Sequence, residues 1–153
     1  FTVGDRIQTT EHTGIVEQIQ ILYTVLRDRN NHRIIIPNGE LSNNSLINFF
    51  ANDHYGVELD FGIGYADDID KAKSILRQLI EKEPRILQDP EPVIAVSQLA
   101  DSSVNITTRS FVSNSQDYWA VGFHLREQVK KEFDAAGISI PFPQRDVHVY
   151  NHN

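Results

Sequence analysis

The stretch "YGVELDFGIGYADDIDKAKSILRQLIEKEP", residues 55–84, decides the fold, because the spacing of its apolar residues changes midway. In the first part, every second residue is apolar: Val57, Leu59, Phe61 and Ile63. This alternation predicts a half-buried strand. In the second part, the apolar residues follow a spacing of three and four: Ile69, Ala72, Leu76, Leu79 and Ile80. This spacing predicts an amphipathic helix, which Pro84 closes.

The sequence after residue 84 predicts two more strands, a second helix and a final strand. Residues 92–100 and 103–112 are typical of strands joined by a short turn. The second helical stripe consists of Val121, Leu125, Val129, Phe133 and Ala136. Gly137 lies where a left-handed helix cap is expected, and Ile138 can pack back on the last turn. With a short strand at 145–150, the predicted order is β-α-β-β-α-β, the ferredoxin-like plan.

This order predicts two helices covering one face of a four-stranded sheet. Asn105, Thr107 and Arg109 share one side of the strand at 103–112. The other face of the sheet is therefore expected to be at least partly polar, and either exposed to water or covered by a partner.

Residues 1–50 lack a helical period and are typical of short strands joined by turns. Asn30-Asn31 predicts a tight hairpin, because Asn tolerates positive φ. The strand in "RIIIPNGEL", residues 33–41, stops at a turn in which Pro37 fixes φ and Gly39 is expected to adopt positive φ.

The predicted class is α+β. It comprises a small bent (Sm-like) β-domain at 1–52, a ferredoxin-like domain at 53–143 and a C-terminal strand at 144–153. The two cores are expected to join near Ala51–Tyr55.

Composition narrows the possible functions. The chain has 153 residues, enough for one ordinary domain or two small ones. Cys is absent, which excludes disulfides and Cys-based zinc sites. The net charge of −7 disfavours proteins that grip nucleic-acid phosphates or anionic membrane surfaces. Met is absent too, and the first residues look internal, so we expect a piece of a longer protein.

Three carboxylates, Asp67, Asp68 and Asp70, could hold Mg²⁺ or Ca²⁺. Their position just before a helical stripe favours helix capping instead.

The remaining candidate patterns favour structural roles. The six histidines lack zinc-ligand spacing, although a ring of His148 could bind metal adventitiously if the C-terminal segment oligomerises. Gly62 and Gly64 lack the context of a dinucleotide loop and favour close packing at a strand end. The aromatic residues near 120 are interpreted as core or subunit interface rather than a nucleic-acid stacking platform; they are Tyr118, Trp119 and Phe123. No catalytic constellation or cofactor site is found.

Several motifs resemble the cytoplasmic part of small-conductance mechanosensitive channels, the MscS family. They are "FTVGDRI", "GIVEQIQILYTVLR", "RIIIPNGELSNNSLINFF", "IGYADDIDKAKSIL" and "FDAAGISIPFPQRDVHV". The resemblance covers almost the whole chain, and "AAGISIPFPQ" is its most specific part.

The resemblance implies a homoheptamer in the cell inner membrane, with this part on the cytoplasmic side. Membrane helices would lie upstream, and the cytoplasmic parts would enclose a vestibule for ions and small solutes, entered through side portals. Such a protein is not an enzyme, takes no cofactor and binds no nucleic acid. On hypo-osmotic membrane tension it would release ions and small solutes.

The resemblance also assigns roles to individual residues. The turn Pro37-Asn38-Gly39 would lie beneath the pore helix, where the amide of Asn38 could form a hydrogen bond. Glu58 would line a portal, although the linker "ANDHYG" lacks the arginines found in some relatives. The C-terminal segment would give one strand to a seven-stranded barrel through Val147, His148, Val149 and Tyr150.

Two other interpretations remain open. A ferredoxin-like regulatory module could bind a small effector between subunits. An RNA-binding module is the third possibility. The acidic balance and the lack of aromatic residues on the sheet strands argue against RNA binding.

Overall fold

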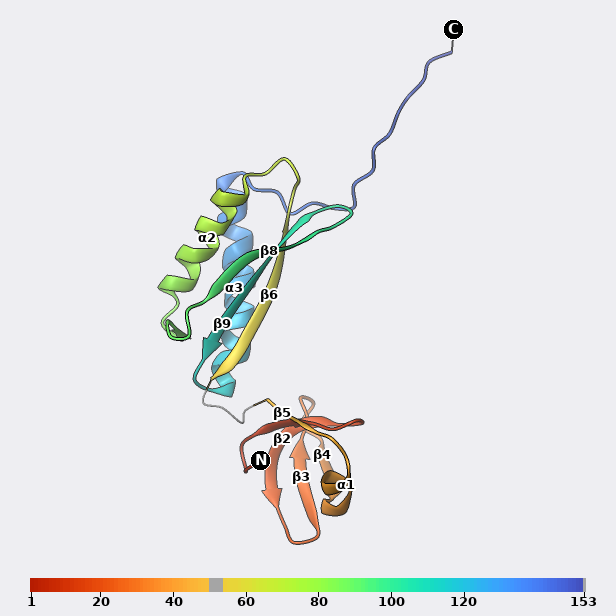
Figure 1. The fold of residues 1–153 in the computed structure, drawn as a ribbon, viewed down its shortest axis with the longest axis vertical. Helices are drawn as coiled ribbons and strands as arrows, with labels where there is room; N and C mark the ends of the chain where they lie inside the picture. Colours follow the sequence, from red (N-terminus) through yellow and green to blue (C-terminus); the bar gives the residue numbers. More distant parts are fainter. Residues whose placement is uncertain (50–53, 153) are drawn as a thin grey trace. The chain divides into compact units, whose positions relative to one another are not determined.

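The computed structural model describes residues 1–49 and 54–152 (Figure 1). The chain divides into two compact units, Phe1–Tyr55 and Gly56–Asn153. The predicted junction near Ala51–Tyr55 falls mostly outside the described residues. Each unit is described by itself.

The first unit is a five-stranded sheet with the strand order β4-β3-β2-β1-β5. Its strands are β1 (Arg6–Gln8), β2 (Thr13–Ile19), β3 (Tyr23–Arg27), β4 (Arg33–Pro37) and β5 (Ile47–Asn48). All four pairings are antiparallel. The register between β2 and β3 shifts between Val16 and Gln18, and a shift of this kind bends a strand. The hairpin between β3 and β4 turns with Asn31 at a φ of 65°, as the Asn-Asn pair predicts.

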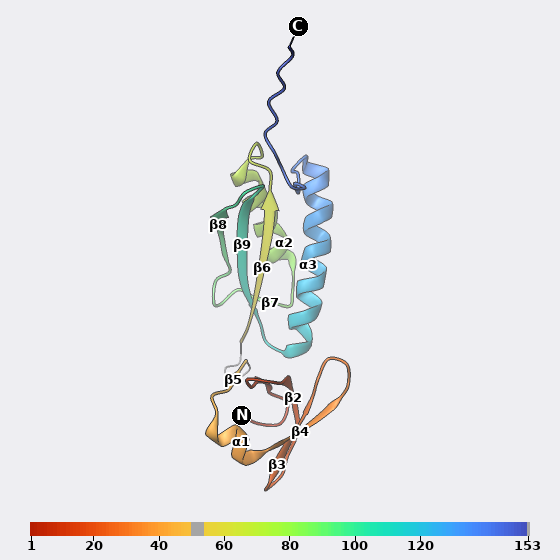
Figure 2. The ribbon, with the colours of Figure 1, turned by 90° about the vertical axis from the view of Figure 1, so that its right-hand side faces the viewer.

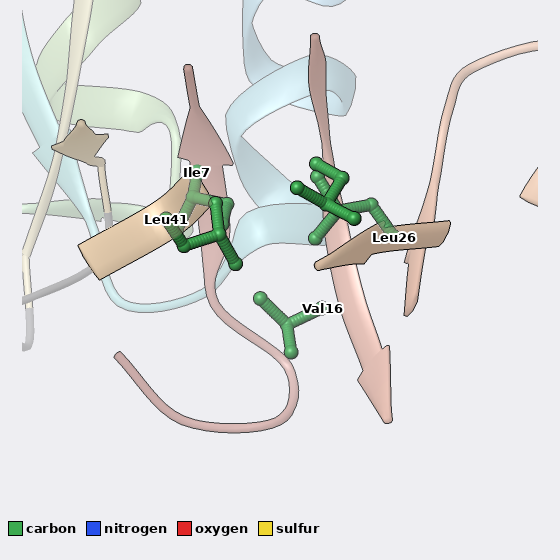
Figure 3. Close-up of a cluster of buried hydrophobic side chains, with 5 residues drawn as sticks. Ile7, Val16, Leu26 and Leu41 are labelled. Carbon is green, nitrogen blue, oxygen red and sulfur yellow. The ribbon is translucent and has the colours of Figure 1, made fainter. Parts of the chain in front are cut away.

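A small aliphatic core fills the concave side of this sheet. It consists of Ile7, Val16, Leu26, Ile36 and Leu41, with Ile34 and Leu46 packed against it. Figure 3 shows Leu41 facing Ile7, with Val16 and Leu26 completing the cluster. Leu41 comes from a short helix, α1 (Asn38–Asn43), which was not predicted.

The predicted conformation of Gly39 is wrong. Among the described glycines only Gly4 and Gly137 have positive φ, and Gly39 lies in the first turn of α1. Pro37 caps this helix with a φ of −57° and a ψ of 134°, so the strand passes directly into a helix instead of a tight turn. Leu41 explains the difference, since one helical turn after Pro37 places its side chain in the core.

The second unit contains β6 (Tyr55–Ile63), α2 (Ile69–Lys82), β7 (Ile86–Leu87), β8 (Val93–Leu99), β9 (Val104–Val112) and α3 (Ser115–Ala136). Its sheet has the order β6-β9-β7, and β8 also pairs with β9. Figure 2 shows both helices on the same side of the sheet, as the sequence predicts. The α+β class is therefore confirmed.

The helix ends match their sequence signals. Asp68 caps α2 by accepting hydrogen bonds from the backbone N–H groups of Asp70 and Lys71. Gly137 ends α3 at a φ of 73°, and the N–H of Ile138 donates to the carbonyl of Phe133 over 2.9 Å. Ile138 is buried, so the chain folds back on the last turn of α3 as expected.

The fourth strand of the sheet differs from the prediction. It is the two-residue β7, which pairs with the end of β9, and not the C-terminal segment. No strand or helix is assigned to residues 138–152. The apolar alternation of Val147 and Val149 predicts a strand, but residues 138–152 pair with no strand of the described chain.

Candidate functional site

Asn38 ties the end of β4 to the loop between β2 and β3. Its amide nitrogen donates to the carbonyls of Gln20 and Ile21 at 2.7 and 3.0 Å. Its amide oxygen accepts from the hydroxyl of Thr24 at 2.7 Å, and Thr24 is buried. Because an Asn amide has only two N–H groups, both are already donated within the first unit.

The loop that Asn38 holds is apolar and open to solvent. The side chains of Ile21 and Leu22 are 94% and 78% exposed. The backbone of Leu22 is fixed as well, because its carbonyl accepts from the N–H of Asn38 at 3.0 Å. We call residues Ile21 and Leu22 the apolar tip. Asn38 therefore fixes the backbone of a loop that carries two large apolar side chains, both exposed to solvent.

Glu58 lies on the polar face of the second sheet, opposite the helices. One oxygen of its carboxylate accepts from Nε and a terminal nitrogen of Arg109 at 3.0 and 2.7 Å. Beside this pair, the hydroxyl of Thr107 donates to Asp60, and the hydroxyl of Ser97 lies 2.7 Å from that of Thr107. The polar face predicted from β9 is confirmed, but the charge of Glu58 is largely neutralised by its partner.

The C-terminal segment carries its apolar residues outward. Val147, Val149 and Tyr150 are 77%, 78% and 78% exposed, and His148 is exposed as well. The start of the segment is held to the body of the second unit. The hydroxyl of Ser102 accepts from the N–H of Gln144 at 3.0 Å.

The three neighbouring carboxylates have different roles. Asp68 caps α2, whereas Asp67 accepts from the N–H of Gly64 and from both the N–H and the hydroxyl of Ser139. The hydroxyl of Ser139 is the main cause that lowers the pKa of Asp67 below its ordinary value. Within residues 1–49 and 54–152, no cluster of three His, Asp or Glu side chains could hold a metal ion.

Two family models match the chain over nearly its full length. The first, "Mechanosensitive ion channel, beta-domain", matches residues 1–51. The second, "Mechanosensitive ion channel MscS, C-terminal", matches residues 57–140. This chain belongs to the MscS family. The two matches correspond to the two kinds of architecture, a small β-sheet followed by an α/β unit.

Some relatives are named as MscS family proteins and others as small-conductance mechanosensitive channels. An MscS family protein of Synechocystis is 40% identical over 149 residues, 97% of this chain and 50% of that protein. A small-conductance mechanosensitive channel of Edwardsiella ictaluri is 37% identical over 150 residues, 98% of this chain and 52% of the relative. The chain thus spans about half the length of the curated relatives it matches.

The fold also matches a solved MscS structure. MscS of Helicobacter pylori in its closed state superposes with a TM-score of 0.87 at 27% identity, covering 99% of this chain and 60% of that one. MscS-family proteins are channels and not enzymes. Among the described residues, no helix is long and apolar enough to cross a membrane.

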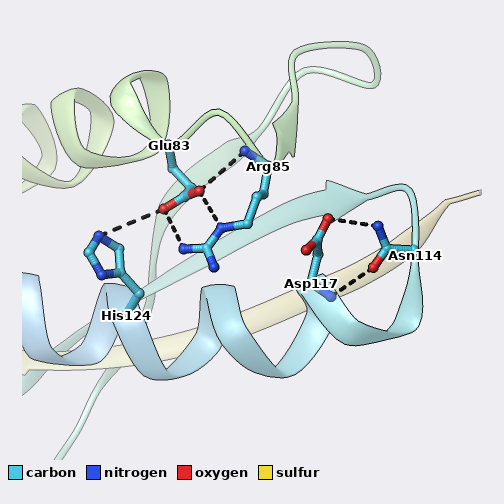
Figure 4. A network of polar contacts seen from close by, with 5 residues as sticks. All are labelled: Glu83, Arg85, Asn114, Asp117 and His124. Carbon is cyan, nitrogen blue, oxygen red and sulfur yellow. Dashed lines mark hydrogen bonds and ion pairs between the residues drawn. The ribbon is translucent and has the colours of Figure 1, made fainter.

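One polar network of this MscS-family chain escaped sequence reasoning. Glu83 follows α2, and its side chain is only 4% exposed. Its carboxylate accepts from Nε and a terminal nitrogen of Arg85 at 2.6 and 3.0 Å, and from the backbone N–H of Arg85. Figure 4 shows Glu83 between Arg85 and His124 of α3, whose Nε2 lies 3.7 Å away. The carboxylate therefore links α2 to α3.

The hydrogen bonds from Arg85 are the main cause that lowers the pKa of Glu83, against the opposing effect of burial. Sequence signals could not find this network, because residues 83 and 124 are far apart and neither stands in a recognisable motif. The one available signal is the position of Glu83 directly after an amphipathic helix, where a buried carboxylate needs a partner.

The aromatic cluster of α3 at Tyr118, Trp119 and Phe123 lies outside the fully buried core. The rings of Tyr118 and Trp119 meet edge to face with centroids 5.1 Å apart, and Phe123 lies beside Trp119 at 6.1 Å. Phe123 is largely exposed and the other two are half-buried. Of the two roles that sequence favoured, core packing is therefore wrong for Phe123, while an interface stays a prediction.

Proposed function

We propose that this chain is the vestibule and assembly part of a mechanosensitive ion channel. In this proposal, identical chains assemble as a homo-oligomer, most simply the heptamer that the family resemblance implies. The full-length protein spans the cell inner membrane through upstream helices, with this part on the cytoplasmic side. It releases ions and small solutes when hypo-osmotic shock raises membrane tension.

The observation that carries the proposal is the C-terminal segment in combination with the family assignment. Three large apolar side chains near the end of the segment are exposed, and their backbone lacks strand partners in this chain. A lone strand cannot satisfy its backbone hydrogen bonds or bury its apolar face. One such strand from each subunit, closed into a barrel, would do both.

Two further elements have roles in this proposal. The start of α1 at Pro37, Asn38 and Gly39 lies beneath the pore helix, and the apolar tip makes the contact, since the amide hydrogens of Asn38 are already donated. Glu58 lines a side portal, where charges raise the local concentration of counter-ions.

Removing residues 144–153 tests the assembly role. Sedimentation of the chain should show a lower oligomer mass, because each subunit loses its barrel strand. The matched control removes only residues 151–153, which lie beyond the apolar run, and should keep the oligomer. An unchanged mass after the longer deletion would contradict the barrel. Hypo-osmotic survival of cells carrying the full-length channel, with and without residues 144–153, tests whether assembly serves release.

A further inference from the structure

A single carboxylate oxygen accepts three hydrogen bonds at the root of the C-terminal segment. Oδ2 of Asp67 accepts from the N–H of Gly64 at 2.8 Å, the N–H of Ser139 at 2.9 Å and the hydroxyl of Ser139 at 2.7 Å. Asp67 precedes α2 and Ser139 follows α3, so this contact joins points 72 residues apart. We call Gly64, Asp67 and Ser139 the clasp.

The clasp explains why residue 64 is a glycine. A Cβ on Gly64 would lie 2.5 Å from the hydroxyl of Ser139 and 2.9 Å from Oδ2 of Asp67. Both distances are shorter than van der Waals contact. Since the φ of Gly64 is not positive, close approach rather than backbone conformation requires the glycine. The position thus accommodates the contact between Asp67 and Ser139.

Additional contacts hold the segment on both sides of the clasp. The ammonium group of Lys71 donates to the carbonyl of Ala136 at 2.7 Å. The N–H of Gln144 donates to the hydroxyl of Ser102 at 3.0 Å. Between Ser139 and Gln144, two prolines restrict φ and stiffen the chain. The root of the segment is therefore held at three places, and the exposed apolar run follows directly.

We propose that Asp67 is a positioning residue for assembly, which directs the C-terminal segment of each subunit toward the common barrel. This inference rests on the proposed function. A segment that leaves its subunit in one direction loses less conformational freedom when strands pair, and ordering a partner in advance raises affinity. Each subunit gains this free energy of association, so a small gain per chain adds up to a large gain for the whole oligomer.

The alternative is that the clasp only stabilises the second unit. The two roles differ in what they change. A purely structural clasp alters the unfolding midpoint, and it alters association only through unfolded protein. A positioning clasp alters association of the folded chain, and only while the segment is present.

The test compares two neighbouring carboxylates. Asp67→Ala removes the clasp, and Asp70→Ala is the matched control, because Asp70 is an exposed residue of the same helix start with equal charge. We expect Asp67→Ala to lower the association constant per subunit of the folded chain about fivefold to tenfold in sedimentation equilibrium, because a freed segment must be ordered when the strands pair. Asp70→Ala should leave the association constant unchanged.

A second variant approaches the clasp from the other side. Ser139→Ala removes the hydroxyl donor while keeping the backbone N–H, so its effect should be smaller than that of Asp67→Ala. The double variant should have the same association constant as Asp67→Ala alone, because both substitutions break the same contact. In a chain lacking residues 144–153, none of these substitutions should change any remaining association.

The outcomes separate this inference from the proposed function. If deletion of 144–153 lowers the oligomer mass but Asp67→Ala behaves like Asp70→Ala, the positioning role is overturned and the barrel stands. If Asp67→Ala still weakens association in the chain lacking 144–153, the clasp acts elsewhere and the inference is again overturned. If the deletion changes nothing, the proposed barrel is contradicted, and the positioning role falls with it.

Discussion

The first unit has a core cluster of five buried apolar side chains against one sheet, whereas the second packs helices of 14 and 22 residues onto a sheet. The five are Ile7, Val16, Leu26, Ile36 and Leu41. The first unit also exposes many large apolar residues for its size: Phe1, Val3, Ile15, Ile19, Ile21, Leu22, Tyr23, Ile35, Ile47 and Phe49. The second unit exposes large apolar residues too, several of them in its C-terminal segment.

This difference has a physical consequence. A domain of about 55 residues buries a smaller fraction of its surface than a domain nearly twice as long, and a core of this size rarely supplies more than ~3–5 kcal/mol. The first unit is therefore expected to depend on neighbouring copies or on an upstream segment for stability. The second unit, with capped helices and a larger core, is expected to be stable on its own.

The largest predicted effect compares one core substitution in each unit. Leu26→Ala and Phe133→Ala both truncate fully buried side chains, and such changes cost ~2–5 kcal/mol. We expect Leu26→Ala to unfold the first unit, because the loss is about as large as the free energy of unfolding of that unit. Phe133→Ala should lower the stability of the second unit without unfolding it.

The two units can be observed separately in this experiment. The single Trp of the chain, Trp119, lies in the second unit, so its fluorescence follows that unit alone. Hydrogen exchange of amides in β2 and β3 follows the first. If Leu26→Ala leaves exchange in β3 unchanged, the first unit is more stable than its core implies.

Glu83→Gln should have the next largest effect. Gln keeps the shape of Glu83 but removes the charge that binds Arg85, so we expect the second unit to lose about 1–3 kcal/mol at neutral pH. Urea unfolding followed by Trp119 fluorescence measures this loss. Exposed Glu81→Gln, on the last turn of α2, is the matched control and should change little.

The same variant predicts a change in pH dependence. The folded pKa of Glu83 lies below its ordinary value of 4.5, so its contribution to stability is present above pH 4.5 and is lost as the pH falls through the folded value. Between pH 5 and pH 3, the second unit of the native chain should therefore lose more stability than that of Glu83→Gln. Parallel pH profiles would show that Glu83 does not carry the effect.

Much of the fold followed from local patterns. The strands β6 and β9 and the helices α2 and α3 have a clear period of two or of 3.6 residues, because one face of each is buried. The strand β8 buries only Ile94 and was located by the short turn that follows it. The helix α1 was missed because its single buried residue, Leu41, cannot establish a period. The strand β7 has only two residues, too few to show a period in the sequence, and its pairing with β9 depends on tertiary contacts.

The site was less predictable, because its contacts join distant residues. Asp67 was expected to cap a helix, but Asp68 caps α2, and Asp67 accepts instead from Gly64 and from Ser139, which lies 72 residues away. The burial of Leu41 in the core of the first unit was missed, because Leu41 stands within a polar segment of the sequence. Sequence singled out Asp67 and Asn38 in these places, and geometry was needed to find their partners.

Asn38→Ala tests how the first unit holds its apolar tip. The substitution removes hydrogen bonds to the carbonyls of Gln20 and Ile21 and leaves the buried hydroxyl of Thr24 without its acceptor. We expect a loss of about 1–2 kcal/mol and faster hydrogen exchange around the tip. Asn43→Ala, an exposed position of the same helix, is the control. Equal behaviour of the two variants would show that Asn38 is an ordinary helix-start residue.

The smallest predicted effect on stability concerns the polar face of the second unit. Glu58 and Arg109 are both about half exposed, and exposed ion pairs contribute little. Glu58→Gln should therefore change the unfolding free energy by less than ~0.5 kcal/mol.

If the polar face lines a portal, the charges of Glu58 and Arg109 affect which ions pass through it. Arg109→Gln leaves the charge of Glu58 without its partner, so reversal potentials of the full-length channel in a salt gradient should shift toward cations. Glu58→Lys should shift them toward anions. Both shifts should shrink above about 0.1 M salt, where the Debye length is ~10 Å or less. Because Glu58→Gln only removes a negative charge while Glu58→Lys also adds a positive one, Glu58→Gln should shift the potential toward anions less than Glu58→Lys does. If none of the three changes moves the potential at low salt, this face does not filter ions by charge, and the acidic surplus of the chain acts elsewhere.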